Sequence, residues 1–217
     1  MGADVTTLIS ALVGAVFGSI GAVSVSHFLQ QNAKTKKEKR LILHSKLYPL
    51  QDSLESLCYR FDNFANRGGQ SVVDNNYFDL TMLYSLGRVL ASEQLLTMSD
   101  VVPLLDLYFN KLGAYLRSNR IDNLFQGIGF HRYDRATLAE MVMTESGGRF
   151  RLSTFIEFRA RYESESSNAK DWLKPAVSAI NSMSPMKLNE LLGEMTTIIN
   201  DLSKETGVPT TINLRSE

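Results

Sequence analysis

The chain is poor in the residues that build disulfide frameworks and metal sites. It has one cysteine, Cys58, so no disulfide can form within the chain, and this usage fits a reducing compartment. The three histidines, His27, His44 and His131, share none of the spacings typical of metal ligands. We therefore expect no metal centre, and Cys58 is interpreted as a buried structural thiol.

The sequence also lacks an excess of positive charge and a recognisable catalytic motif. Its 23 basic residues balance 23 acidic ones, which gives no electrostatic case for a nucleic-acid partner. There is no nucleophile elbow and no phosphate-binding loop, and Gly127-Ile128-Gly129 has two glycines without the third of a dinucleotide motif. No cofactor is predicted, and a binding function is favoured over an enzymatic one.

Charged side chains are absent from residues 5–33. About 20 mostly apolar residues cross a bilayer as a helix, and residues 5–29 provide them. The preceding residues contain Asp4 and no lysine or arginine, unlike the basic start of a cleaved signal peptide. The sequence predicts one transmembrane helix over about residues 5–29, within an N-terminal segment 1–33.

A basic cluster follows this apolar run and predicts its orientation. Residues 34–40 form a stop-transfer flank, and loops rich in lysine and arginine stay on the cytoplasmic side. We expect the N-terminus outside and the rest of the chain in the cytoplasm, at a plasma or bacterial inner membrane. Cations beside a membrane also attract anionic headgroups, so membrane lipid is an expected partner. The flank comprises Lys34, Lys36, Lys37, Lys39 and Arg40.

Small residues recur every four positions along the predicted anchor. Such a stripe lets two helix backbones approach closely in lipid, and the serines add hydrogen-bonding groups. This association face predicts a homo-oligomer, although glycine and alanine are common in transmembrane helices in any case. Its members are Ser10, Gly14, Gly18, Ala22 and Ser26.

The remaining sequence predicts an all-α domain over residues 41–207, followed by a flexible tail, 208–217. No segment shows sustained strand alternation. The expected helices after the first glycine pair cover residues 78–98, 103–116, 133–145, 150–162, 169–183 and 185–206, with Gly147 and Gly148 closing the third of these.

Apolar residues at alternating steps of four and three form a heptad seam after the basic flank. Pro49 lies inside it and predicts a bend or a restart of the helix near Tyr48. The seam is either a coiled coil beside the membrane or, as we favour, a face packed on later helices of the same chain. It comprises Leu43, Leu47, Leu50, Leu54, Leu57, Phe61 and Phe64.

Three charged residues, Arg88, Glu93 and Glu140, lie in otherwise apolar helical segments. A buried charge requires a partner, and a structural ion pair of Arg88 with Glu140 is the favoured interpretation. The alternative is a ligand pocket. Residues 125–135 are rich in polar and aromatic side chains, and they either line such a pocket or form a loop in which Asp134 caps the next helix.

Three functions are compatible with these patterns. The leading interpretation is a single-pass membrane protein whose helical domain acts as a scaffold or sensor, with a possible protein partner. The second is an effector that oligomerises through its anchor and perturbs the membrane. The third is a membrane-tethered enzyme with a pocket near Arg88, Glu93, His131 and Arg132.

Overall fold

The computed structural model describes residues 31–66, 75–99, 101–109, 112–117, 120–164 and 168–211. The chain divides into two compact units, residues 1–42 and residues 43–217. In the first unit, residues 31–42 are helical. The predicted anchor and its association face lie outside the described residues, and no helix within those residues is long and apolar enough to cross a membrane.

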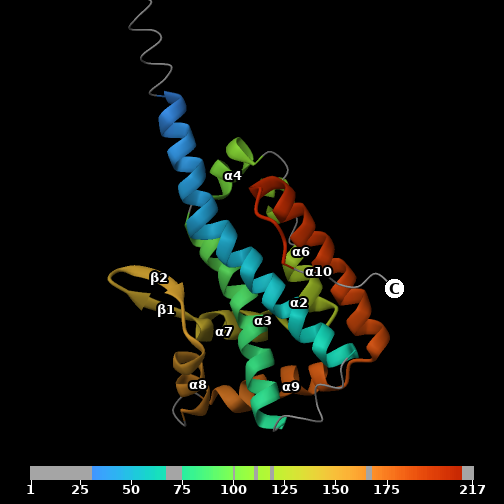
Figure 1. Cartoon of the computed structure of the whole chain (residues 1–217). Helices are drawn as coiled ribbons and strands as arrows, with labels where there is room; N and C mark the ends of the chain where they lie inside the picture. Colours follow the sequence, from blue (N-terminus) through green and yellow to red (C-terminus); the bar gives the residue numbers. More distant parts are fainter. Residues whose placement is uncertain are drawn as a thin grey trace, which may run out of the picture. The chain divides into compact units, whose positions relative to one another are not determined.

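The second unit is mostly helical, which supports the predicted all-α class (Figure 1). A two-stranded hairpin is inserted between its helices. The elements are η1 (Leu43–Leu47), α2 (Tyr48–Asn66), α3 (Asn75–Met98), α4 (Val102–Tyr108), α5 (Leu112–Arg117), α6 (Arg120–Gln126), α7 (Arg132–Val142), β1 (Met143–Ser146), β2 (Arg149–Leu152), α8 (Phe155–Glu163), α9 (Ala169–Asn181) and α10 (Pro185–Thr206).

The heptad seam packs within the chain. Helix α2 lies against both α3 and α10 (Figure 1), and this explains why a stripe with coiled-coil spacing needs no second chain. Phe64, half-buried at the end of the seam, stacks on Phe78 of α3 with ring centroids 5.1 Å apart. The five central seam residues are completely buried, namely Leu47, Leu50, Leu54, Leu57 and Phe61.

The helix geometry changes at Tyr48, as Pro49 predicts. Residues Leu43–Leu47 form a π-helical turn, and regular α-helix begins at Tyr48. Proline has no N–H to donate to the preceding turn, and π-helix, which is rare, occurs mostly as single turns inserted in α-helices. The Pro49 carbonyl accepts a hydrogen bond from the Ser53 hydroxyl at 2.6 Å.

Helix α3 is the central helix of the second unit and packs against α2, α7 and α8. Its residues are apolar around most of its circumference, so that it is buried on several sides. Gly87 marks its tightest contact, because an added Cβ would lie 2.5 Å from Val142 Cγ2 and 3.1 Å from the Leu138 carbonyl oxygen of α7.

The hairpin corrects the sequence interpretation of residues 143–152. The helix expected to reach residue 145 ends at Val142, and β1 pairs antiparallel with β2 from Met143↔Leu152 to Ser146↔Arg149. Gly147 and Gly148 both have positive φ (59° and 74°) and connect the strands. Two consecutive residues with positive φ suit the tight turn of a hairpin, whereas the end of a helix needs only one residue with positive φ.

Three further features of the chain differ from the expectation. The helix predicted over 103–116 is two short helices, α4 and α5, and α6 is an additional helix. The start of the predicted flexible tail is held against α2: the Gln51 amide donates to the Val208 carbonyl at 3.5 Å, and Glu55 accepts hydrogen bonds from Thr211. Residues 212–217 lie outside the described residues.

Cys58 is completely buried in α2, on the side of the core formed with α10. Burial raises the pKa of its thiol to about 12, although a hydrogen bond with Thr196 opposes this effect. The expected structural role is consistent with this position, because a buried protonated thiol is a poor nucleophile.

Candidate functional site

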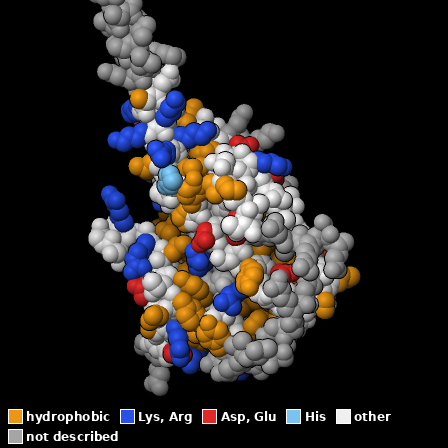
Figure 2. Space-filling model, in the orientation of Figure 1, with side chains coloured by type: hydrophobic (Ala, Val, Ile, Leu, Met, Phe, Trp, Pro, Cys, Tyr) orange, Lys and Arg blue, Asp and Glu red, His pale blue; other side chains and the backbone are white. Residues whose placement is uncertain are grey.

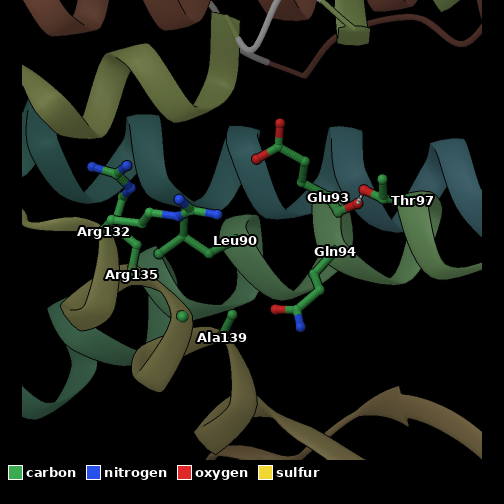
Figure 3. A pocket seen from close by; sticks show the side chains of 8 residues that line it. Leu90, Glu93, Gln94, Thr97, Arg132, Arg135 and Ala139 are labelled. Atoms are coloured by element: carbon green, nitrogen blue, oxygen red, sulfur yellow. Dashed lines mark hydrogen bonds between the residues drawn. The ribbon is translucent and has the colours of Figure 1, made fainter.

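A cleft of about 390 Å³ lies between α3 and α7 (Figure 3). Helix α3 contributes Leu90, Glu93, Gln94 and Thr97. Helix α7 contributes Arg132, Arg135, Ala136 and Ala139. In each helix the lining residues stand at relative positions 0, 3, 4 and 7, which form a single stripe along a helix. The cleft therefore results from two facing helical stripes.

Arg135 is the buried charge of this site. Its side chain extends from α7 into the space beside α3 (Figure 3), and the residue is only 7% exposed. Its Nη1 donates a hydrogen bond of 2.7 Å to the Phe130 carbonyl oxygen. This bond fixes the guanidinium, because a charge-assisted hydrogen bond in a buried place is among the stronger polar contacts.

Helix α3 contributes a negatively charged side chain and an amide to the cleft. Glu93 is half-buried and points its carboxylate toward the cleft, with the Gln94 amide on the same helix (Figure 3). The Thr97 hydroxyl donates to the Glu93 backbone carbonyl at 2.7 Å. The cleft thus combines two guanidinium groups, one carboxylate and one amide over an apolar floor of leucine and alanine.

The structure brings together part of the predicted pocket. Glu93 and Arg132 line the cleft, whereas Arg88 and His131 do not. His131 is exposed and precedes α7, where its backbone N–H donates to the Asp134 carboxylate at 3.1 Å. Asp134 therefore has the predicted capping role, and the predicted polar segment contributes Arg132 and Arg135 to the cleft.

The expected ion pair of Arg88 with Glu140 is wrong. Glu140 is exposed, because it lies on the solvent side of α7. Arg88 instead pairs with Asp52 of α2 at 2.7 Å and is partly exposed itself, at 24% of its side chain. The sequence indicates buried charges by the apolar character of their neighbours. Arg135 belongs to the polar segment predicted to line a pocket, but its burial was not predicted, because its helical neighbours are less apolar.

Two other arginines hold the hairpin in place. Arg161 of α8 donates to the backbone carbonyls of Met141 and Met143, at 3.0 and 2.5 Å, and to the Thr144 hydroxyl. Arg151 of β2 forms a bidentate pair with Glu157, at 2.7 and 3.1 Å. Hydrogen bonds from the Arg151 guanidinium and the Thr154 backbone lower the pKa of Glu157 to about 2. These contacts are structural.

The basic flank occupies the helix of the first unit. All five of its lysine and arginine residues are exposed, and Figure 2 shows basic side chains gathered along this helix. Lys34 approaches Glu38 at 3.9 Å, one helical turn away, and remains 79% exposed in its side chain. The segment therefore presents its charge to the surroundings.

No group of three or more histidine, cysteine or acidic residues able to hold a metal ion occurs among the described residues. Comparison with protein-family models, curated proteins and solved structures finds no match.

Proposed function

We propose that the chain is a single-pass membrane protein that presents a helical interaction domain on the cytoplasmic side and assembles through its anchor. The observation that carries this proposal is the uncharged run of residues 5–33 followed directly by exposed basic residues. Each exposed cation near an anionic leaflet contributes roughly 1 kcal/mol to membrane attraction.

The helical unit supports a role in binding. It has its own buried core, formed by α2, α3, α7 and α10, and a domain of this size can fold as one unit. Large apolar side chains remain exposed on several of its helices. They offer contact points for a partner protein, and the most exposed non-tyrosine examples are Leu107, Ile156, Trp172 and Met186.

A topology assay tests the membrane placement. A reporter that is active only in the cytoplasm, fused after Glu217, should be active, and one that is active only outside should be silent. Membrane fractionation should recover the full chain in the membrane pellet after a carbonate wash. The opposite reporter pattern, or release by carbonate, would contradict the proposal.

A second experiment tests assembly. Gly14→Ile with Gly18→Ile places branched side chains where two backbones are expected to meet, and crosslinked oligomers should be lost. The matched control, Ala11→Ile with Ala15→Ile, places the same branched side chains on another helix face and should leave crosslinking unchanged. Equal behaviour of the two double variants would exclude assembly through this face.

A further inference from the structure

We propose that the cleft between α3 and α7 binds a small zwitterion, a molecule that carries a phosphate or carboxylate beside an ammonium group. Arg132 and Arg135 receive the anionic group, and Glu93 receives the ammonium. This inference concerns the helical unit alone and holds whether or not residues 5–29 span a membrane.

The positive side of the cleft is suited to an oxyanion. Two guanidinium groups on successive turns of α7 lie on the same side (Figure 3), and planar guanidinium forks match carboxylate and phosphate oxygens. Arg132 is the first residue of α7, where the helix dipole adds positive potential. The hydrogen bond from Arg135 to Phe130 holds one fork in position before a ligand arrives.

The negative side of the cleft favours a ligand that is not a simple anion. Glu93 projects from α3 across from the guanidinium groups (Figure 3). A second anion placed near this carboxylate would be repelled, whereas an ammonium would be attracted. The arrangement therefore selects a molecule with both charges and disfavours one that carries negative charge alone.

The dimensions of the cleft agree with a small ligand. Its volume of about 390 Å³ lies within the range of about 300–1,000 Å³ found for small-molecule sites. Leu90, Ala136 and Ala139 provide an apolar floor, and Gln94 adds an amide that both donates and accepts hydrogen bonds. A few oriented polar groups on an apolar surface are typical of ligand sites.

Titration calorimetry of the full chain in mild detergent with phosphoethanolamine tests the proposal. Saturable binding is expected, with ethanolamine and inorganic phosphate binding at least tenfold more weakly, since each lacks one of the two charges. Heat that grows linearly with concentration and never saturates would overturn the proposal. So would equal affinity for phosphoethanolamine and inorganic phosphate.

Variants locate the binding. Arg132→Gln should weaken phosphoethanolamine binding about tenfold or more. Glu93→Gln should weaken phosphoethanolamine binding but strengthen the binding of inorganic phosphate, because it removes the carboxylate that repels an anion. Arg149→Gln, an exposed arginine on the hairpin, is the matched control and should bind normally. Equal affinities for the Arg132 and Arg149 variants would overturn the proposal.

The same chemistry occurs in free metabolites and in lipid headgroups. Repeating the titration in nanodiscs of phosphatidylcholine, with and without phosphatidylethanolamine, separates these sources. Phosphoethanolamine binding that persists in both discs identifies a soluble ligand. Binding that is lost only when phosphatidylethanolamine is present identifies the lipid headgroup as occupant. Failure of the topology assay would leave the titrations in detergent and the results for the variants unaffected.

Discussion

The contact of α3 with α7 at Gly87 gives the sharpest test of the packing. A Cβ at this position would lie 2.5 Å from Val142 Cγ2, 3.1 Å from the Leu138 carbonyl oxygen and 3.2 Å from Leu138 Cγ. Ordinary contacts between carbon atoms are about 3.5–4.0 Å. Gly87→Ala therefore requires the two helices to separate by about 1 Å or Val142 to leave its rotamer.

The expected magnitude follows from two opposing effects. Overpacking a core costs about 1–3 kcal/mol, and the better helix propensity of alanine returns about 1 kcal/mol. We expect Gly87→Ala to lower the free energy of unfolding by about 0–2 kcal/mol. Urea denaturation of the full chain, followed by circular dichroism at constant detergent concentration, measures this difference.

Gly193 provides a matched control on α10. It is exposed, and no described atom lies within 4 Å of the position that its Cβ would occupy. Gly193→Ala should therefore raise the free energy of unfolding by about 0.5–1 kcal/mol. If both alanine variants were stabilising, the close approach of α3 and α7 at Gly87 would be refuted.

A double-mutant cycle identifies the clashing atom. Val142→Ala removes Cγ2 and by itself leaves a cavity in the core. In its presence Gly87→Ala should cost less than in the wild-type background, with a coupling energy of about 0.5–3 kcal/mol. If the two changes in the free energy of unfolding were strictly additive, Val142 would not be the cause of the destabilisation by Gly87→Ala.

Three further changes have expected outcomes. Glu157→Gln should destabilise the protein at neutral pH. Folding lowers the pKa of Glu157 from 4.5 to about 2, so the ionised carboxylate contributes its full stabilisation above pH 4.5 and loses it as the pH falls to about 2. The difference in melting temperature between wild type and variant should therefore vanish near pH 2. Arg161→Met should cost about 1.5–3 kcal/mol in urea titrations, since it removes charge-assisted hydrogen bonds to the hairpin, and an unchanged midpoint would contradict that role. Gly207→Ala, at φ 72°, should cost about 1–2 kcal/mol in the same titrations, and an unchanged value would show that the C-terminus of α10 tolerates a side chain.

The sequence predicts the long helices well because their signals are local. Ser184 accepts a hydrogen bond from the Lys187 backbone and begins α10, and Gly207 ends it, both as the capping pattern predicts. The heptad seam identifies the buried face of α2 correctly. The choice between self-packing and a coiled coil needs the three-dimensional fold, since one stripe suits either partner.

The hairpin was missed although its signal is present. A Gly-Gly pair between two short segments is a recognised hairpin pattern, but apolar residues on both sides also satisfied helix spacing. Four-residue strands are too short for alternation to outweigh that competing pattern. The ion pair of Arg88 was wrong for a different reason, because Asp52 lies on another helix and no local spacing connects the two residues.

The cleft was predictable only in part. Glu93 and Arg132 stand out as charges near apolar or aromatic residues, but the pairing of their stripes depends on how α3 and α7 cross. Arg135 is buried through tertiary packing and by its bond to Phe130. Its sequence neighbours give no sign of this burial.

The reactivity of the single thiol, Cys58, reports how often the core of the helical unit opens. Cys58 is fully buried with a pKa raised to about 12, so almost none of it is thiolate at pH 8 in the folded state. A disulfide reagent can react only when α2 separates from its neighbours, and the reaction rate then measures the free energy of that opening. A cysteine introduced on the surface would react first, which allows a fluorophore or spin label to be attached at one chosen position without removing the native residue.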